Sequence, residues 1–267
     1  MRVLQDPARR VIRTSTDLLD VVVETLDEVS QELPSHCELL WDRTPGTSRR
    51  KPSEDNQAIP DVWRPKPEAA LCAHLTHELT LRLAGHRVAV NREVLIHPTD
   101  PYGAGDRTDL LVETLASPGD PSDRASGGPV KLVIEVKGAW NRDVMTAQEE
   151  QLANRYLPQA RVDAGIYLVG WYPFELWNAT GDSRKTQAKK PHPDTLLAHL
   201  RGQAASLSES GAFHLRPMVI KIPRPHRQWI CLRLPLMWVP WQLLGEGLSS
   251  PEQREAEIFL QSSPSGR

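Results

Sequence analysis

An apolar run at residues 130–134 leads directly into Glu135-Val136-Lys137, so an acid and a lysine occupy a strand that otherwise has the composition of a buried one. Side chains alternate between the two faces of a strand, which puts Glu135 and Lys137 on one face and Ile134 and Val136 on the other. Charged side chains are rarely buried unless they are paired or bind a metal. Any fold that buries this strand in a covered β-sheet must therefore give Glu135 and Lys137 a charged partner or a metal ion.

A salt bridge on a solvated edge strand is the simplest interpretation of Glu135 and Lys137. The continuous apolar stretch before them argues against it, because such stretches are typical of strands that are covered on both faces. A second strand-like run carries Asp109, which adds a carboxylate on a neighbouring strand. We therefore expect these three residues to form a functional cluster inside a sheet.

The remaining periodicity predicts an α/β fold in which a central mixed β-sheet is flanked by helices. Four segments are expected: an N-terminal helical extension at 1–41, a linker at 42–66, a main domain at 67–245 and a C-terminal tail at 246–267. The predicted helices lie at 11–33, 67–83, 143–157 and 195–207, and the predicted strands at 87–96, 106–113, 129–138, 164–171 and 218–222.

The first predicted helix has an apolar seam with alternating steps of three and four residues, at Leu19, Val22, Leu26, Val29 and Leu33. Two interpretations of the seam remain open. It packs on the main domain, or it contacts a partner protein or a second copy of the chain.

Composition limits the function classes. The 267 residues are 39% hydrophobic, enough for a sizeable core, and the net charge of −2 provides no overall basic field, so any contact with nucleic acid must be local. No run approaches the ~20 apolar residues of a membrane span, and no apolar segment follows the early arginines as in a signal peptide. The three cysteines are far apart, which argues against a disulfide framework or a zinc site and fits a reducing cytoplasm.

Carboxylates on neighbouring strands beside a lysine suit phosphodiester hydrolysis. Bound Mg²⁺ neutralises charge on the phosphate and orients a water, and a lysine can stabilise or position the attacking hydroxide. Mg²⁺ prefers hard oxygen ligands and keeps several waters, so an Asp, a Glu and one backbone carbonyl make an adequate site. Mn²⁺ is expected to substitute for Mg²⁺.

Asp109, followed 26 positions later by Glu135-x-Lys137 and then by a glutamine-bearing helix, resembles the PD-(D/E)XK nuclease superfamily and its restriction-endonuclease-like fold. The resemblance covers roughly residues 67–175. It implies that Asp109, Glu135 and the carbonyl of Val136 hold the metal and that Lys137 positions the water. Thr108 replaces the proline that usually precedes the Asp, a departure common in the superfamily.

The resemblance also implies auxiliary residues. Glu68 or Glu93 would be an additional acid, and Gln148 or Gln151 would lie near the scissile phosphate. At 100° per residue Glu68 falls within the leucine face of its helix; it points inward, or it serves the helix dipole and reaches solvent. The Q-x-x-x-Y pattern of one exonuclease branch is not met, because Tyr156 follows Gln151 one residue too late.

The function implied by the resemblance is that of a Mg²⁺-dependent nuclease, with DNA favoured over RNA as the substrate. Similar nuclease modules are fused to or encoded with bacterial defence proteins, which suggests an effector module of such a system. The alternative is a catalytically silent module of the same fold that binds nucleic acid or scaffolds a partner protein.

Overall fold

The computed structural model describes residues 11–46, 59–98, 105–115, 128–187, 192–209, 211 and 213–225. The chain divides into two units, Met1–His226 and Arg227–Arg267, and all described residues belong to the first. The predicted boundary at 245/246 lies outside the described residues.

The α-helices are α1 (Ser15–Glu32), α2 (Glu68–Arg82), α4 (Leu157–Ala160), α5 (Ser183–Gln187) and α6 (Pro193–Ser208). Shorter 3₁₀ turns are η3 (Leu33–Ser35), η4 (Cys37–Leu40), η5 (Ala84–His86) and η7 (Phe174–Leu176), and η6 (Gln148–Tyr156) is a π-helix.

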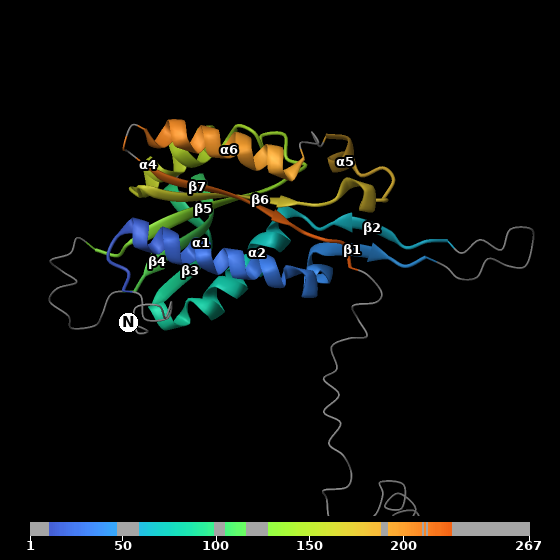
Figure 1. Ribbon diagram of the computed structural model, residues 1–267, viewed down its shortest axis with the longest axis horizontal. Helices are drawn as coiled ribbons and strands as arrows, with labels where there is room; N and C mark the ends of the chain where they lie inside the picture. The colour runs from blue at the N-terminus through green and yellow to red at the C-terminus, as the bar shows by residue number, and fades with distance from the viewer. Residues whose placement is uncertain are drawn as a thin grey trace, which may run out of the picture. The chain divides into compact units, whose positions relative to one another are not determined.

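A five-stranded sheet in the order β3-β4-β5-β6-β7 forms the centre of the fold (Figure 1). β3 and β4 are antiparallel, as are β4 and β5, whereas β5, β6 and β7 run parallel. The predicted α/β architecture with a mixed sheet is confirmed. The strands are β3 (Val88–Pro98), β4 (Gly105–Thr114), β5 (Lys131–Gly138), β6 (Ala164–Trp171) and β7 (His214–Lys221).

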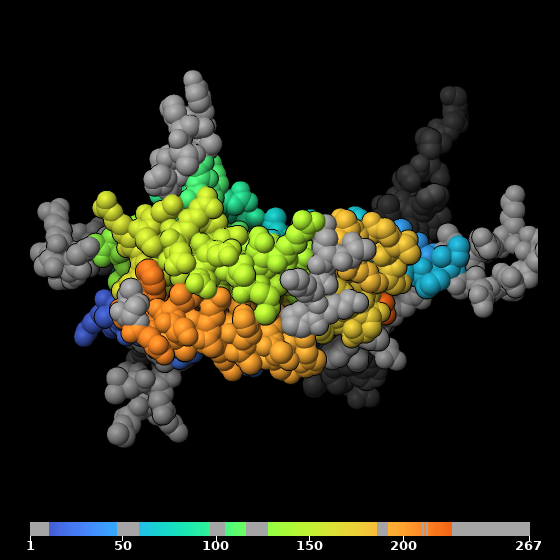
Figure 2. Space-filling model, turned by 90° about the horizontal axis from the view of Figure 1, so that it is seen from above, coloured from blue at the N-terminus to red at the C-terminus, as the bar shows by residue number. Residues whose placement is uncertain are grey.

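Helices cover both faces of this sheet. α1 and α2 pack on the face formed by residues such as Leu132, Ile134 and Val136. η6, α4 and α6 belong to the opposite face, with Val133 and Tyr167. Figure 2 shows α6 in orange beside the yellow-green segment that contains η6. Because alternate residues of β5 point to opposite layers, Glu135 and Lys137 lie on the face of η6.

α1 is part of this domain and not an extension of it. A capping box fixes its start, since Thr14 accepts a hydrogen bond from the backbone of Asp17 and the Asp17 carboxylate accepts one from the backbone of Thr14. All five predicted seam residues are buried in the same core as α2 and the sheet. Of the two interpretations of the seam, packing on the main domain is the one observed, and a partner or second copy that contacts the rest of this helix stays a prediction.

The predicted linker at 42–66 is wrong at both ends. β1 (Trp41–Thr44) and β2 (Val62–Pro65) pair as a two-stranded antiparallel sheet. The backbone of Trp63 donates a hydrogen bond of 2.6 Å to the Asn178 side chain, which ties β2 to the segment after β6. The polar composition of 42–66 concealed these short strands, and residues 47–58 lie outside the described part of the chain.

The other elements follow the prediction closely. α2 buries its leucine stripe of Leu71, Leu75, Leu79 and Leu83 as predicted. The predicted α-helix at 143–157 is instead the π-helix η6, which begins at Gln148 and leads into α4. No helix in the described ranges is both long and apolar enough to cross a membrane.

Candidate functional site

The site is centred where β4 and β5 stop pairing. Their ladder ends at Leu110 and Ile134, so the next residues, Asp109 and Glu135, face each other across the gap. Beyond this point a side chain links the two strands. Asp109 Oδ2 accepts a hydrogen bond of 2.8 Å from the backbone N–H of Val136. The predicted meeting of these two carboxylates is present in the structure.

Lys137 lies on the same face as Glu135, as the strand alternation predicts. Its Nζ donates a hydrogen bond to Glu135 Oε1 at 2.5 Å, and Glu135 is buried. β5 is the middle strand of the sheet, so the alternative of a salt bridge on a solvated edge strand is wrong.

The Glu135–Lys137 pair has more negative than positive charge around it, because Asp109 adds a second carboxylate. Burial and the charge of Asp109 raise the pKa of Glu135 to about 8, although Lys137 opposes the shift. Burial alone would lower the pKa of Lys137, but the Glu135 carboxylate outweighs that effect and the net shift is upward. The site therefore favours an added positive charge, either a proton or a cation.

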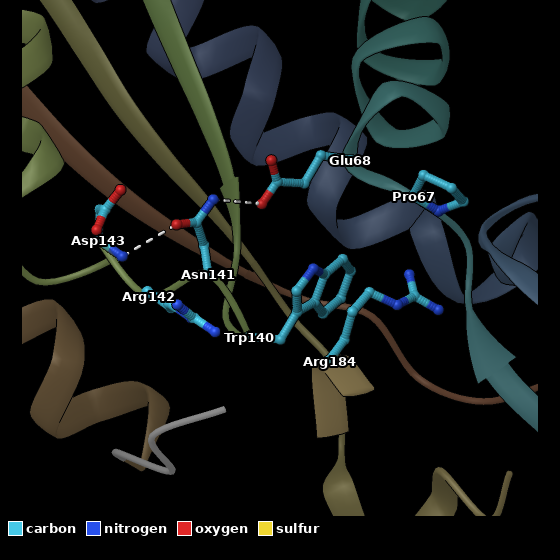
Figure 3. Close-up of a pocket in the computed structure, with 7 residues that line it drawn as sticks. All are labelled: Pro67, Glu68, Trp140, Asn141, Arg142, Asp143 and Arg184. Atoms are coloured by element: carbon cyan, nitrogen blue, oxygen red, sulfur yellow. Dashed lines mark hydrogen bonds between the residues drawn. The ribbon is translucent and has the colours of Figure 1, made fainter. Parts of the chain in front are cut away.

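Glu68 reaches the cluster from the first turn of α2, so the inward orientation is observed of the two that the sequence left open. Its Oε1 accepts a hydrogen bond of 2.7 Å from the N–H of Gly138. It accepts a second one of 3.1 Å from Asn141 Nδ2 (Figure 3). Glu68 therefore fixes the end of β5 directly after Lys137. Its carboxylate also acts electrostatically on Lys137.

Glu93 has a different environment. The pairs Arg92–Leu110 and Val94–Thr108 put it opposite Asp109 in the β3–β4 register. Its backbone adopts a left-handed conformation, with φ 51°, and its side chain is 68% exposed and pairs with Arg92 at 3.5 Å. A left-handed residue interrupts strand alternation, so register alone does not place the carboxylate. Of the two predicted auxiliary acids, Glu68 is the one that bonds to the cluster strand.

Gln148 does not lie at the cluster. Its side chain is fully buried, and Nε2 donates to the carbonyl of Leu200 at 3.0 Å and to Gln203 Oε1 at 3.1 Å. The prediction was that Gln148 or Gln151 lies near the scissile phosphate, and for Gln148 it is wrong. Its amide bonds to α6 instead, and a pattern along its own helix could not reveal that distant contact.

Tyr156 is the residue near the cluster that sequence reasoning did not count as a site residue, because it follows Gln151 one residue too late for the Q-x-x-x-Y pattern. Burial and the charge of Glu135 raise the pKa of Tyr156, which places its hydroxyl within electrostatic range of the cluster. In a π-helix the hydrogen bonds run from i to i+5, so a spacing of five has the role that four has in an α-helix. Gln151 and Tyr156 therefore lie on one side of η6. The sequence has four residues between them where the Q-x-x-x-Y pattern has three, and this longer spacing was the available signal for a π-helix.

The carboxylates of Asp109 and Glu135 and the carbonyl of Val136 are the oxygen donors that the prediction assigns to a metal. Among the described residues, no group of three or more His, Cys, Asp or Glu side chains could hold a metal ion. In a β-strand the N–H and C=O of one residue point to the same neighbour. Since the N–H of Val136 points to Asp109, its carbonyl is directed to the same side. This donor set fits a hard cation that keeps several waters.

The fold and cluster together define an α/β protein with a buried carboxylate–lysine site at the carboxyl end of its central strand. No protein-family model matches this chain, and no match to it was found among curated proteins or solved structures. The chemistry of the cluster is therefore the basis on which a function can be assigned.

Proposed function

We propose that this protein is a Mg²⁺-dependent nuclease of the PD-(D/E)XK type, which hydrolyses phosphodiester bonds, with DNA favoured over RNA. The observation that carries the proposal is that Asp109 and Lys137, both partly buried, meet the buried Glu135 where β4 and β5 separate. A structural ion pair needs one acid for one base, whereas this cluster has an excess of carboxylates. A divalent cation offsets that excess.

Asp109, Glu135 and the carbonyl of Val136 would hold the metal. Bound Mg²⁺ supplies charge neutralisation at the phosphate and lowers the pKa of a coordinated water. Among the described residues Lys137 is the cation bonded to Glu135, and its ammonium has three N–H donors, so it can keep Glu135 and still donate to the attacking water. Gln151 and Tyr156 of η6 would be the polar groups that contact the bound phosphate.

The silent-module alternative has its own support. Lys137 already bonds Glu135, and Asp109 already bonds Val136, so the polar groups have partners without a metal. A protein of that kind would bind nucleic acid or a partner protein through this domain and cleave nothing.

The cellular context is a further proposal. The net charge of −2 provides little general attraction to nucleic acid, so a partner that delivers the substrate would help this chain. An effector module of a bacterial defence system, acting in the cytoplasm, meets that requirement.

A cleavage assay tests the proposal. Purified protein is incubated with single- and double-stranded DNA and RNA in Mg²⁺, Mn²⁺ or EDTA, beside the variant Glu135→Gln. We expect cleavage of DNA with Mg²⁺ or Mn²⁺, none in EDTA, and none by the variant. Absence of cleavage, combined with retained nucleic-acid binding and no Mg²⁺ binding, would establish the silent module instead.

A further inference from the structure

A hollow of about 680 Å³ lies beside the cluster, between the start of α2, the segment after β5 and α5 (Figure 3). It shares Glu68 with the cluster, and Glu68 bonds to Gly138, the residue after Lys137. The hollow therefore opens next to the bond that the proposed nuclease would cut. Its volume falls within the range of roughly 300–1,000 Å³ found for ligand sites. The lining residues are Pro67, Glu68, Trp140, Asn141, Arg142, Asp143 and Arg184.

One wall is a tryptophan held against the end of β5. A Cβ on Gly138 would lie 2.5 Å from the Trp140 ring, so only glycine at 138 allows this ring position. Trp140 also packs edge-on against Trp177, with ring centroids 5.7 Å apart. The wall is thus rigid and aromatic.

Arg184 covers this wall and is fixed in place. Its guanidinium lies over the rings of Trp140 and Trp177, 5.2 and 5.5 Å from their centroids. Nη2 donates to Asp182 Oδ2 and to the carbonyl of Pro65, both at 2.8 Å. A planar guanidinium held in this way is a surface on which a nucleic-acid base can stack.

The hollow has a positive charge at its rim and carboxylates further in, an arrangement that suits a nucleotide. Arg142 is exposed, and its guanidinium has no ion-pair or hydrogen-bond partner among the described residues. It can therefore bind a phosphate at the rim. Glu68 and Asp143 contribute carboxylates that would repel a phosphate further in but can accept hydrogen bonds from the amino group of a base.

We propose that this hollow receives one unpaired base next to the scissile bond, with the adjoining phosphate on Arg142, so that the substrate is single-stranded at the cleavage point. The inference rests on the proposed nuclease function and specifies its substrate. A base stacked inside a duplex cannot enter a hollow on the protein surface without leaving its pair. A single strand, a flap or a frayed end meets the requirement.

Binding measurements test this without depending on cleavage. Full-length protein carrying Lys137→Ala is titrated, in EDTA, against a fluorescein-labelled DNA oligonucleotide as a single strand and as a duplex. We expect the single strand to bind more tightly by about 5- to 100-fold, the range that stacking of one base provides. An abasic nucleotide moved along the strand should weaken binding at one position by a similar factor.

Arg142→Gln, made in the same background, tests the phosphate contact. It should weaken single-strand binding and reduce the slope of log affinity against log salt by about 1. The matched control is Arg13→Gln, because Arg13 lines another hollow, of about 540 Å³, together with Lys131, the first residue of β5. That hollow lies at the opposite end of the strand, so this variant should bind like its parent.

Equal binding of single strand and duplex, no abasic effect, or identical behaviour of Arg142→Gln and Arg13→Gln would overturn the inference. If the wild-type protein still cleaves nucleic acid in Mg²⁺ in that case, the nuclease proposal stands and only the role of the hollow is wrong. If the single strand is preferred but nothing is cleaved, the hollow is a binding site and the nuclease proposal is the one that fails.

Discussion

Two clusters in this protein each combine one cation with three carboxylates, but they differ in burial. In the β5 cluster, Lys137 lies with Glu135, Asp109 and Glu68, and the side chains of Lys137 and Glu135 are only 13% and 3% exposed. In the α1–α2 cluster, Arg82 pairs with Glu28, Glu32 and Glu78. There the Arg82 side chain is 24% exposed and those of Glu28 and Glu32 are 60% and 55% exposed.

The comparison shows that burial, and not residue composition, distinguishes a candidate site from a surface network. Water screens the excess negative charge of the α1–α2 cluster, so its carboxylates can remain ionised at little cost. The β5 cluster has no such screening, and its excess charge calls for a proton or a metal ion. Substitutions that are chemically alike should therefore have different consequences in the two clusters.

Replacement of the central cations should give the largest contrast. Lys137→Ala is expected to lower kcat for nucleic-acid cleavage by about 10²- to 10⁴-fold, because it removes the group that positions the water. The fold should remain, since the lysine contributes little core area. Arg82→Ala should cleave at the wild-type rate. Steady-state kinetics and circular dichroism of both variants measure this, and a Lys137→Ala protein with the wild-type rate would refute the mechanism.

Metal affinity should separate the carboxylates of the two clusters. Asp109→Asn and Glu135→Gln should each weaken Mg²⁺ binding by roughly 10- to 100-fold, because an amide keeps the shape of the ligand but loses its charge. Glu32→Gln should leave the affinity unchanged. Isothermal titration calorimetry gives the three values, and equal affinities in all variants would exclude a metal at the β5 cluster.

The pH dependence of stability should differ as well. The pKa of Glu135 is raised to about 8 in the folded protein from a reference of 4.5, so between these values the folded state keeps a proton that the unfolded state has lost. In EDTA, stability should therefore fall as pH rises through this window, by about 1.4 kcal/mol per pH unit from this group. Urea unfolding should show that slope reduced in Glu135→Gln and retained in Glu32→Gln. Equal slopes in wild type and Glu135→Gln would contradict the assignment.

Glu68 should have a smaller effect that combines stability and activity. Glu68→Gln weakens the charge-assisted hydrogen bonds to Gly138 and Asn141, which should cost about 1 kcal/mol of unfolding free energy. Cleavage should also decrease, because these bonds hold the end of β5 beside Lys137. Denaturant unfolding and cleavage rates of one variant decide the role. Full activity with lowered stability would mean that Glu68 is only structural.

The smallest effect is expected at the α1–α2 cluster itself. Arg82→Ala should destabilise the protein by less than about 1 kcal/mol, since its partners are exposed or partly exposed surface acids. The loss should shrink further in high salt. A destabilisation of several kcal/mol, measured by urea unfolding, would show that the exposed cluster behaves like a buried one.

Local periodicity in the sequence was enough to predict much of the site. Alternation along β5 put Glu135 and Lys137 on one face, and the 100° step of α2 put Glu68 on its buried side; both are confirmed. The order of helices and strands predicted the mixed sheet. These features depend on residues close together in the chain, and for that reason a pattern in the sequence reveals them.

Only the tertiary structure decided which auxiliary residues lie near the cluster. Gln148 bonds to α6, Tyr156 is close enough to Glu135 for that charge to raise the pKa of the tyrosine, and the Glu93 carboxylate is largely exposed. The sequence also suggested a linker where β1 and β2 pair. Each outcome depends on contacts with distant segments, which can override local preference because they determine what is buried. The sequence by itself determined which charged residues share a strand, and the packing around that strand determined that they are buried together.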